Sequence, residues 1–160
     1  MDEELKINKK IFDYAIRLLS MRDYSTHKLT GKLKSRDFTE EEIQPVIDKL
    51  IHYNYLREEA YTKARIKQFL QKGFSNHLIL IKLTNEKLTS TNETIDQVRE
   101  EQDLSEENQI QKIILKKLRS KEIPENFEDK TKLKNKIISF LCSKGHCPEK
   151  ATLMLLDHKL

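Results

Sequence analysis

The sequence predicts an all-α protein built from three tandem three-helix units. Only three of its 160 residues are Gly, too few for Gly-rich phosphate loops or the turns of a β-sandwich. Apolar residues recur at helical spacing, and strand-type alternation never runs longer than a few residues. Charged residues make up 35% of the chain, which is high for one compact globule. Several small helical cores with much solvated surface fit this composition better.

Capping residues mark the expected helix ends. Thr39 and Glu42 form a capping-box pattern, which satisfies two backbone N–H groups at a helix start. Gly73 suits the position after a helix, and Pro148 suits the first turn of the last one. The run 89–102 has only Ile95 and Val98 to bury, so we expect it to be the weakest helix. The other expected helices cover 9–22, the segments that start after Ser25, Thr39, Ser75, Ser105 and Cys147, and the runs 58–71 and 130–143.

Weak internal similarity divides these helices into units. At an offset of 50 residues, Tyr24-Ser25 falls on Phe74-Ser75; at an offset of 108, Leu29 and Leu33 fall on Ile137 and Leu141. The alternative is one irregular bundle whose amphipathic pattern imitates repetition. We favour the repeat because the caps align as well as the apolar residues. The expected units are 1–56, 57–103 and 104–160, with Tyr24, Leu33, Phe38, Phe74 and Leu83 in their cores.

Two segments of the chain resemble the bacterial RecX family. One is Leu18-Leu19-Ser20-Met21-Arg22-Asp23-Tyr24-Ser25, followed by Leu29 and Lys32-Leu33; the other is Leu56-Arg57-Glu58-Glu59-Ala60-Tyr61, running on to Lys72-Gly73-Phe74. The likeness covers about residues 10–88, and the last third only by pattern. Asn54 stands where the family usually has Gly, which Asn can replace at a left-handed helix end. Arg57-Glu58 replaces a usual acidic pair, and Glu86-Lys87-Leu88 lacks a usual Gly.

The resemblance implies an elongated, curved array of three three-helix repeats and a non-enzymatic role. RecX proteins bind in the groove of the RecA–DNA filament and restrain strand exchange and ATP hydrolysis. We therefore expect an inhibitor of RecA, with single- or double-stranded DNA of weak sequence preference as a further partner. Two alternatives stay open: a helical DNA-binding protein or transcription regulator, and a helical adaptor without nucleic-acid contact. We expect a monomer.

Positive charge is concentrated in two stretches. Residues 61–87 hold six basic side chains and one acid, and residues 112–136 hold nine basic side chains and four acids. The first 56 residues are neutral, with ten of each sign. These stretches are either solvated helix faces or a surface that neutralises phosphates. With the resemblance, we expect filament or DNA contacts at Lys63, Lys67, Lys72, Lys82, Lys112, Lys116, Arg119, Lys132 and Lys136.

No motif of metal binding or catalysis emerges. Cys142, His146, Cys147 and His158 have a spacing that matches no standard zinc signature. No nucleophile has a His placed with it by a recognisable motif, and there is no P-loop. We expect no metal, no cofactor and no enzymatic activity. The sequence also shows no membrane-length apolar stretch and no signal peptide, and its two cysteines suit a reducing compartment, so we expect a cytoplasmic protein.

Overall fold

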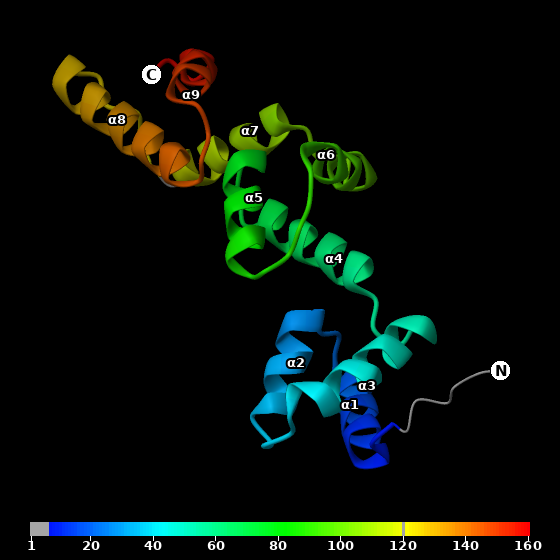
Figure 1. Ribbon diagram of the computed structural model, residues 1–160. Coiled ribbons are helices and arrows are strands. Elements are labelled where there is room, and N and C mark those ends of the chain that lie inside the picture. Colours follow the sequence, from blue (N-terminus) through cyan, green and yellow to red (C-terminus); the bar gives the residue numbers. More distant parts are fainter. Residues whose placement is uncertain (1–6, 120) are drawn as a thin grey trace. The chain divides into compact units, whose positions relative to one another are not determined.

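The computed structural model describes residues 7–119 and 121–160, and over these residues it contains helices and no strand (Figure 1). The prediction of an all-α fold is confirmed. The helices of this part of the chain follow one another with short connections. In chain order they are α1 (Lys9–Met21), α2 (Thr26–Lys34), α3 (Glu40–His52), α4 (Glu58–Gln71), α5 (Asn76–Asn85), α6 (Asn92–Glu101), α7 (Glu106–Leu118), α8 (Phe127–Ser143) and α9 (Pro148–Leu156).

The chain divides into two compact units. The first is Met1–Ala64 and the second is Arg65–Leu160, so the division falls inside α4. In the first unit, α1, α2 and α3 share one hydrophobic core. In the second unit, α7, α8 and α9 share another. Grouping by three consecutive helices agrees with the tandem three-helix prediction, while the expected boundaries 1–56, 57–103 and 104–160 stay a prediction.

The core of the first unit joins the apolar stripes of its three helices. Leu33 is fully buried and Tyr24 is almost so, as the pattern predicts. Phe38 is half-buried and packs against this core. The fully enclosed members are Ile11, Ala15, Leu29, Leu33, Val46 and Leu50. Burying an aliphatic side chain of this size stabilises the fold by roughly 1.5–3 kcal/mol.

The second unit buries Leu83 as expected, and the Phe74 ring packs edge-on against the buried Phe69, with their centroids 6.0 Å apart. Phe74 is only half-buried, and lysine side chains cover part of its ring. Ile95 and Val98 are the buried apolar residues of α6, together with the charged Arg99, which the pattern does not mark. The core of α7, α8 and α9 consists of Ile110, Ile114, Ile137, Leu141, Ala151, Leu155 and Leu160.

Local capping explains most helix starts. The hydroxyls of Ser25, Ser75 and Ser105 each accept a hydrogen bond from the backbone N–H three residues later. Thr39 and Glu42 complete a reciprocal capping box, as predicted. The expected start of the eighth helix at residue 130 is wrong. Asn126 accepts from the backbone N–H of Asp129, so α8 begins at Phe127.

Gly145 lies at a point of close approach inside the second unit. Its φ of +86° is a left-handed conformation that L residues adopt at a cost. A Cβ on Gly145 would lie 2.9 Å from Leu78 Cβ and closer still to the Ser75 hydroxyl. This glycine therefore lets the turn between α8 and α9 sit against the start of α5.

Replacing Gly145 tests this approach. We expect Gly145→Ala to lower the free energy of unfolding by about 2–4 kcal/mol, since it adds left-handed strain to a steric clash. Urea unfolding followed by far-UV circular dichroism measures the change. Gly31→Ala is the matched control: Gly31 lies within α2, and a Cβ there meets no atom within 4 Å. It should be neutral or stabilise by up to about 1 kcal/mol. Equal midpoints for the two variants would contradict the packing argument.

Candidate polyanion-binding pocket

Two turns far apart in the sequence are hydrogen-bonded to each other in the second unit. The backbone N–H of Ser75 donates to the carbonyl of Lys144 over 2.9 Å. The Nε2 atom of His146 lies 2.9 Å from the carbonyl oxygen of Gly73, and the His146 side chain is completely enclosed. These bonds tie the α4–α5 turn to the α8–α9 turn. The walls of the pocket described below come from both sides of this contact.

The surroundings of His146 define its hydrogen-bonding state. A carbonyl oxygen only accepts, so Nε2 carries a proton toward Gly73. The Nδ1 atom lies 3.4 Å from the Glu106 carboxylate. Lys150 Nζ lies 2.7 Å from Glu106 and 2.5 Å from Glu107, closing a small charged network. Burial opposes ionisation of Glu106, but hydrogen bonds from Lys150 and His146 hold the pKa of this carboxyl below its ordinary value.

A second buried network fixes the start of α7. Gln109 is 3% exposed, and its Nε2 donates to the carbonyls of Leu70 and Phe74 over 2.7 and 3.3 Å. Its Oε1 accepts from the guanidinium of Arg99, which also donates to Asn76. Gln109 thereby supplies a donor to the carbonyl of Phe74, in the turn after α4, and a second donor to that of Leu70, which also accepts from the backbone N–H of Gly73. Sequence reasoning missed both Gln109 and Arg99, because a polar residue in a helix pattern reads as surface.

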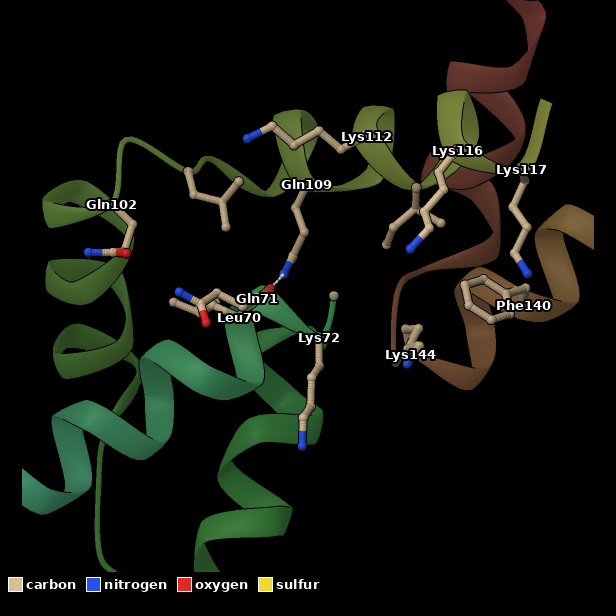
Figure 2. A pocket seen from close by; sticks show the side chains of 13 residues that line it. Leu70, Gln71, Lys72, Gln102, Gln109, Lys112, Lys116, Lys117, Phe140 and Lys144 are labelled. Atoms are coloured by element: carbon tan, nitrogen blue, oxygen red, sulfur yellow. Dashed lines mark hydrogen bonds between the residues drawn. The ribbon is translucent and has the colours of Figure 1, made fainter. Parts of the chain in front are cut away.

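A pocket of about 680 Å³ opens beside these networks (Figure 2). Its walls come from the end of α4, the α6–α7 connection, α7 and the C-terminal part of α8. No carboxylate lines it, and no described acidic residue forms an ion pair with any lysine that does. The side-chain amides of Gln71 and Gln102 contribute polar groups to the lining. The lysines of the lining are Lys72, Lys112, Lys116, Lys117 and Lys144; we call these the pocket lysines.

The pocket lysines do not converge on one point. In Figure 2, Lys116 and Lys117 extend from α7 toward α8, whereas Lys72 extends away from α7. A single small anion would need donors aimed at one position. Ammonium groups spread around a rim instead match a ligand that carries several negative charges along its length.

Aromatic rings hold some of these lysines in place. The ammonium of Lys117 lies 3.6 Å from the centroid of the Phe140 ring. Lys144 Nζ lies 4.5 Å from the Phe74 centroid and 5.5 Å from that of Phe140, and Lys82 Nζ lies 4.5 Å from Phe74. Cation–π contacts of this kind are worth about 0.5–1 kcal/mol at exposed sites. They order the long side chains before any ligand binds.

The structure brings together only part of the predicted contact set. Lys72, Lys112 and Lys116 line the pocket, and sequence reasoning missed Lys117 and Lys144, which join them. Lys117 lies within the basic stretch 112–136, so the sequence could have indicated it as a contact residue. No local sequence feature indicates Lys144. The other predicted residues lie outside the lining: Lys63 pairs with Glu59, Lys132 pairs with Asp129, Lys82 contacts Phe74, and Lys67, Arg119 and Lys136 are exposed.

The positive charge is local to this pocket rather than general to the middle third. Residues 57–103 carry eight basic and eight acidic side chains in total. Acids of α6, among them Asp96 and Glu100, offset the basic stretch 61–87. Of the lysines predicted in the stretch 61–87, only Lys72, just after α4, lines the pocket together with residues of α7 and α8.

Cys142, His146, Cys147 and His158 have different surroundings in the structure. Cys142 and Cys147 are exposed, and Cys147 occupies the N-cap of α9. His146 is held within the second unit, and His158 lies beside Gln111. Over residues 7–119 and 121–160, no three His, Cys, Asp or Glu side chains are grouped so that they could hold a metal ion. None of the helices described is long and apolar enough to cross a membrane.

Comparisons with known proteins agree on one family. A family model described as the first three-helix domain of RecX matches residues 12–50, which span α1 to α3. The regulatory protein RecX of Haemophilus influenzae strain PittEE is 28% identical over 135 residues, covering 84% of this chain and 85% of that protein. That of Vibrio parahaemolyticus is 30% identical over 77 residues, or 48% of this chain.

A solved structure shares the fold of the whole chain. The crystal structure of RecX from Lactobacillus salivarius superposes with a TM-score of 0.69 over 93% of this chain and 94% of that one, at 19% identity. All three comparisons find this chain similar to RecX proteins. The resemblance read from the residues is thereby confirmed. The pocket lies in α4 to α8, beyond the segment that the family model matches.

The charged network around His146 predicts a pH dependence of stability. The lowered pKa of Glu106 means that its ionised form stabilises the fold above the ordinary carboxylate pKa of about 4.3. This contribution is lost as the pH falls through the folded-state pKa. The pKa of Lys150 is raised by its bonds to Glu106 and Glu107, so its contribution is lost only in strong alkali.

We expect Glu106→Gln to lower the melting temperature at pH 7 and to flatten the loss of stability between pH 5 and pH 3. Thermal unfolding by circular dichroism at each pH measures both effects. Glu41→Gln removes an exposed carboxylate from the first turn of α3 and serves as the control, with a profile like that of the unmodified protein. Superimposable profiles for Glu106→Gln and Glu41→Gln would contradict the role of the network.

Proposed function

We propose that this chain is a non-enzymatic inhibitor of the RecA recombinase, which binds in the groove of the RecA–DNA filament and restrains strand exchange and ATP hydrolysis. The observation that carries the proposal is the pocket lined by five lysines and no carboxylate. Similarity to RecX proteins supports it, because these relatives are named regulatory proteins. DNA repair and homologous recombination are the processes that such an inhibitor would serve.

The pocket lysines suit a phosphate backbone better than base edges. An ammonium is a compact, strongly hydrated charge, and it attracts phosphates without reading sequence. Base readout relies on bidentate Arg, Asn or Gln side chains presented together. The three pocket amides, at Gln71, Gln102 and Gln109, come from different segments: the end of α4, the residue that follows α6, and α7. Weak sequence preference is the expected consequence.

Binding by itself accounts for inhibition in this proposal. A protein lodged in the filament groove occupies the space that an incoming duplex needs, and it holds neighbouring subunits against the movements that accompany nucleotide turnover. In this proposal the chain acts as a monomer, because one chain supplies every residue that lines the pocket. It acts in the cytoplasm.

A helical DNA-binding protein or transcription regulator is the second candidate. The three-helix grouping of α7, α8 and α9 favours it, since such units can present a helix to the major groove. This candidate requires tight binding to one particular duplex sequence. Comparison of several unrelated duplexes at equal length and salt separates it from the filament inhibitor.

Charge reversal at the pocket tests the proposal. We expect the triple variant Lys72→Glu, Lys112→Glu, Lys116→Glu to need at least about tenfold more protein to halve RecA-dependent ATP hydrolysis on single-stranded DNA. Each lost phosphate contact should also reduce the slope of the logarithm of the binding constant against the logarithm of the salt concentration by about one. Far-UV circular dichroism should show unchanged helicity, because all three side chains are exposed.

The triple variant Lys9→Glu, Lys10→Glu, Lys32→Glu is the matched control. It makes the same change in net charge at exposed lysines of the first unit, outside the pocket. We expect it to inhibit nearly as well as the unmodified protein. Full inhibition by the pocket variant would contradict the assigned site, and an equal loss in both variants would show that net charge rather than the pocket is responsible.

A further inference from the structure

An exposed aromatic cluster lies at the C-terminal end of α3 in the first unit. Tyr53 and Tyr55 are each 55% exposed, and their ring centroids are 6.4 Å apart at an interplanar angle of 44°. The His52 ring meets Tyr53 edge-on at 5.1 Å. We call these three rings the α3-end cluster. The same unit buries Tyr24 in its core, so exposure here is not a general property of its tyrosines.

A rigid turn presents the cluster. Asn54 has a φ of +59°, the left-handed conformation that ends a helix. The backbone N–H groups of Tyr55 and Leu56 both donate to the carbonyl of Leu50, over 2.8 and 3.1 Å. Leu56, at 3% exposure, anchors the turn in the hydrophobic core. Rings fixed in this way lose little conformational entropy when they bind a partner.

Basic side chains lie close to the cluster, while Asp48, Glu58 and Glu59 flank its segment on either side. The ammonium of Lys49 lies 5.8 Å from the Tyr53 centroid and 5.6 Å from that of Phe12. The segment 49–57 carries Lys49, His52 and Arg57 and no acidic residue. A polyanion can therefore approach these rings without meeting a carboxylate of the same segment.

We propose that Tyr53 and Tyr55 form a stacking platform for unpaired bases of a single-stranded nucleic acid. Every base offers a π face to an exposed aromatic ring, and flanking cations attract the backbone that carries it. Phe74 and Phe140 of the second unit differ, because their rings are only half-buried and offer less open face than Tyr53 and Tyr55. A protein partner would require a wider apolar patch than two hydroxyl-bearing rings and the half-exposed Ile51. The platform needs no recombinase, so it stands apart from the proposed inhibition.

Paired oligonucleotides test the platform. Fluorescence anisotropy compares a labelled 12-mer of thymidine with an abasic 12-mer of tetrahydrofuran residues, which has the same phosphates and no bases. We expect the full chain to bind the thymidine strand roughly tenfold more tightly. Tyr53→Leu, Tyr55→Leu should abolish this preference and leave the affinity for the abasic strand unchanged. Tyr53→Phe, Tyr55→Phe keeps the π faces and should keep the preference.

Several outcomes would overturn the platform. Equal affinity of the unmodified chain for both strands would do so, as would a preference that survives in the double Leu variant. If that variant fails to inhibit RecA while the unmodified chain shows no base preference, the cluster is a protein contact instead. The pocket variant Lys72→Glu, Lys112→Glu, Lys116→Glu provides a separate arm, because it should weaken binding to both strands equally. Failure of that arm concerns the lysine pocket and not the tyrosines.

Discussion

The second unit depends on the enclosed contact between His146 and the carbonyl of Gly73. A buried polar group without a partner costs about 1–3 kcal/mol, so neither the imidazole nor the carbonyl can be left unpaired cheaply. Around this contact lie the Ser75–Lys144 backbone bond, the close approach at Gly145 and the pairing of Lys150 with Glu106. Together they hold the end of α4 near α7 and α8. The pocket lysines come from these three segments, so their arrangement follows from the same constraint.

The pocket gathers like charges at a cost to folding. Ammonium groups repel one another, and no described carboxylate pairs with the five that line the pocket. Phe140 and Phe74 offset part of this repulsion through their contacts with Lys117, Lys144 and Lys82. Natural surfaces usually intersperse the two signs of charge. An unbalanced, ordered group of cations is better explained by a negatively charged partner than by stability.

The two units carry different binding chemistry. The first is neutral overall and displays tyrosines on a rigid turn, whereas the second concentrates lysines around a pocket. Cations contribute affinity that salt weakens, and exposed rings contribute stacking that salt leaves largely intact. A regulator that must recognise a nucleoprotein filament gains from both, since its partner presents phosphates and bases of any sequence. This division is consistent with the proposed inhibition by binding.

The sequence by itself determined most helices and caps, apart from the start of α8 at Asn126, and the left-handed turn at Asn54. These features depend on contacts three to five residues apart, such as Thr39 with Glu42, so local chemistry suffices. The sequence could not predict the structural role of His146, because its position near Cys142 and Cys147 makes it a candidate metal ligand. Its partner Gly73 lies 73 residues away, and only the tertiary structure brings them together. The same reason explains Lys144, Gln109 and Phe74: each acquires its role from a distant segment, and no local pattern records which segment that will be.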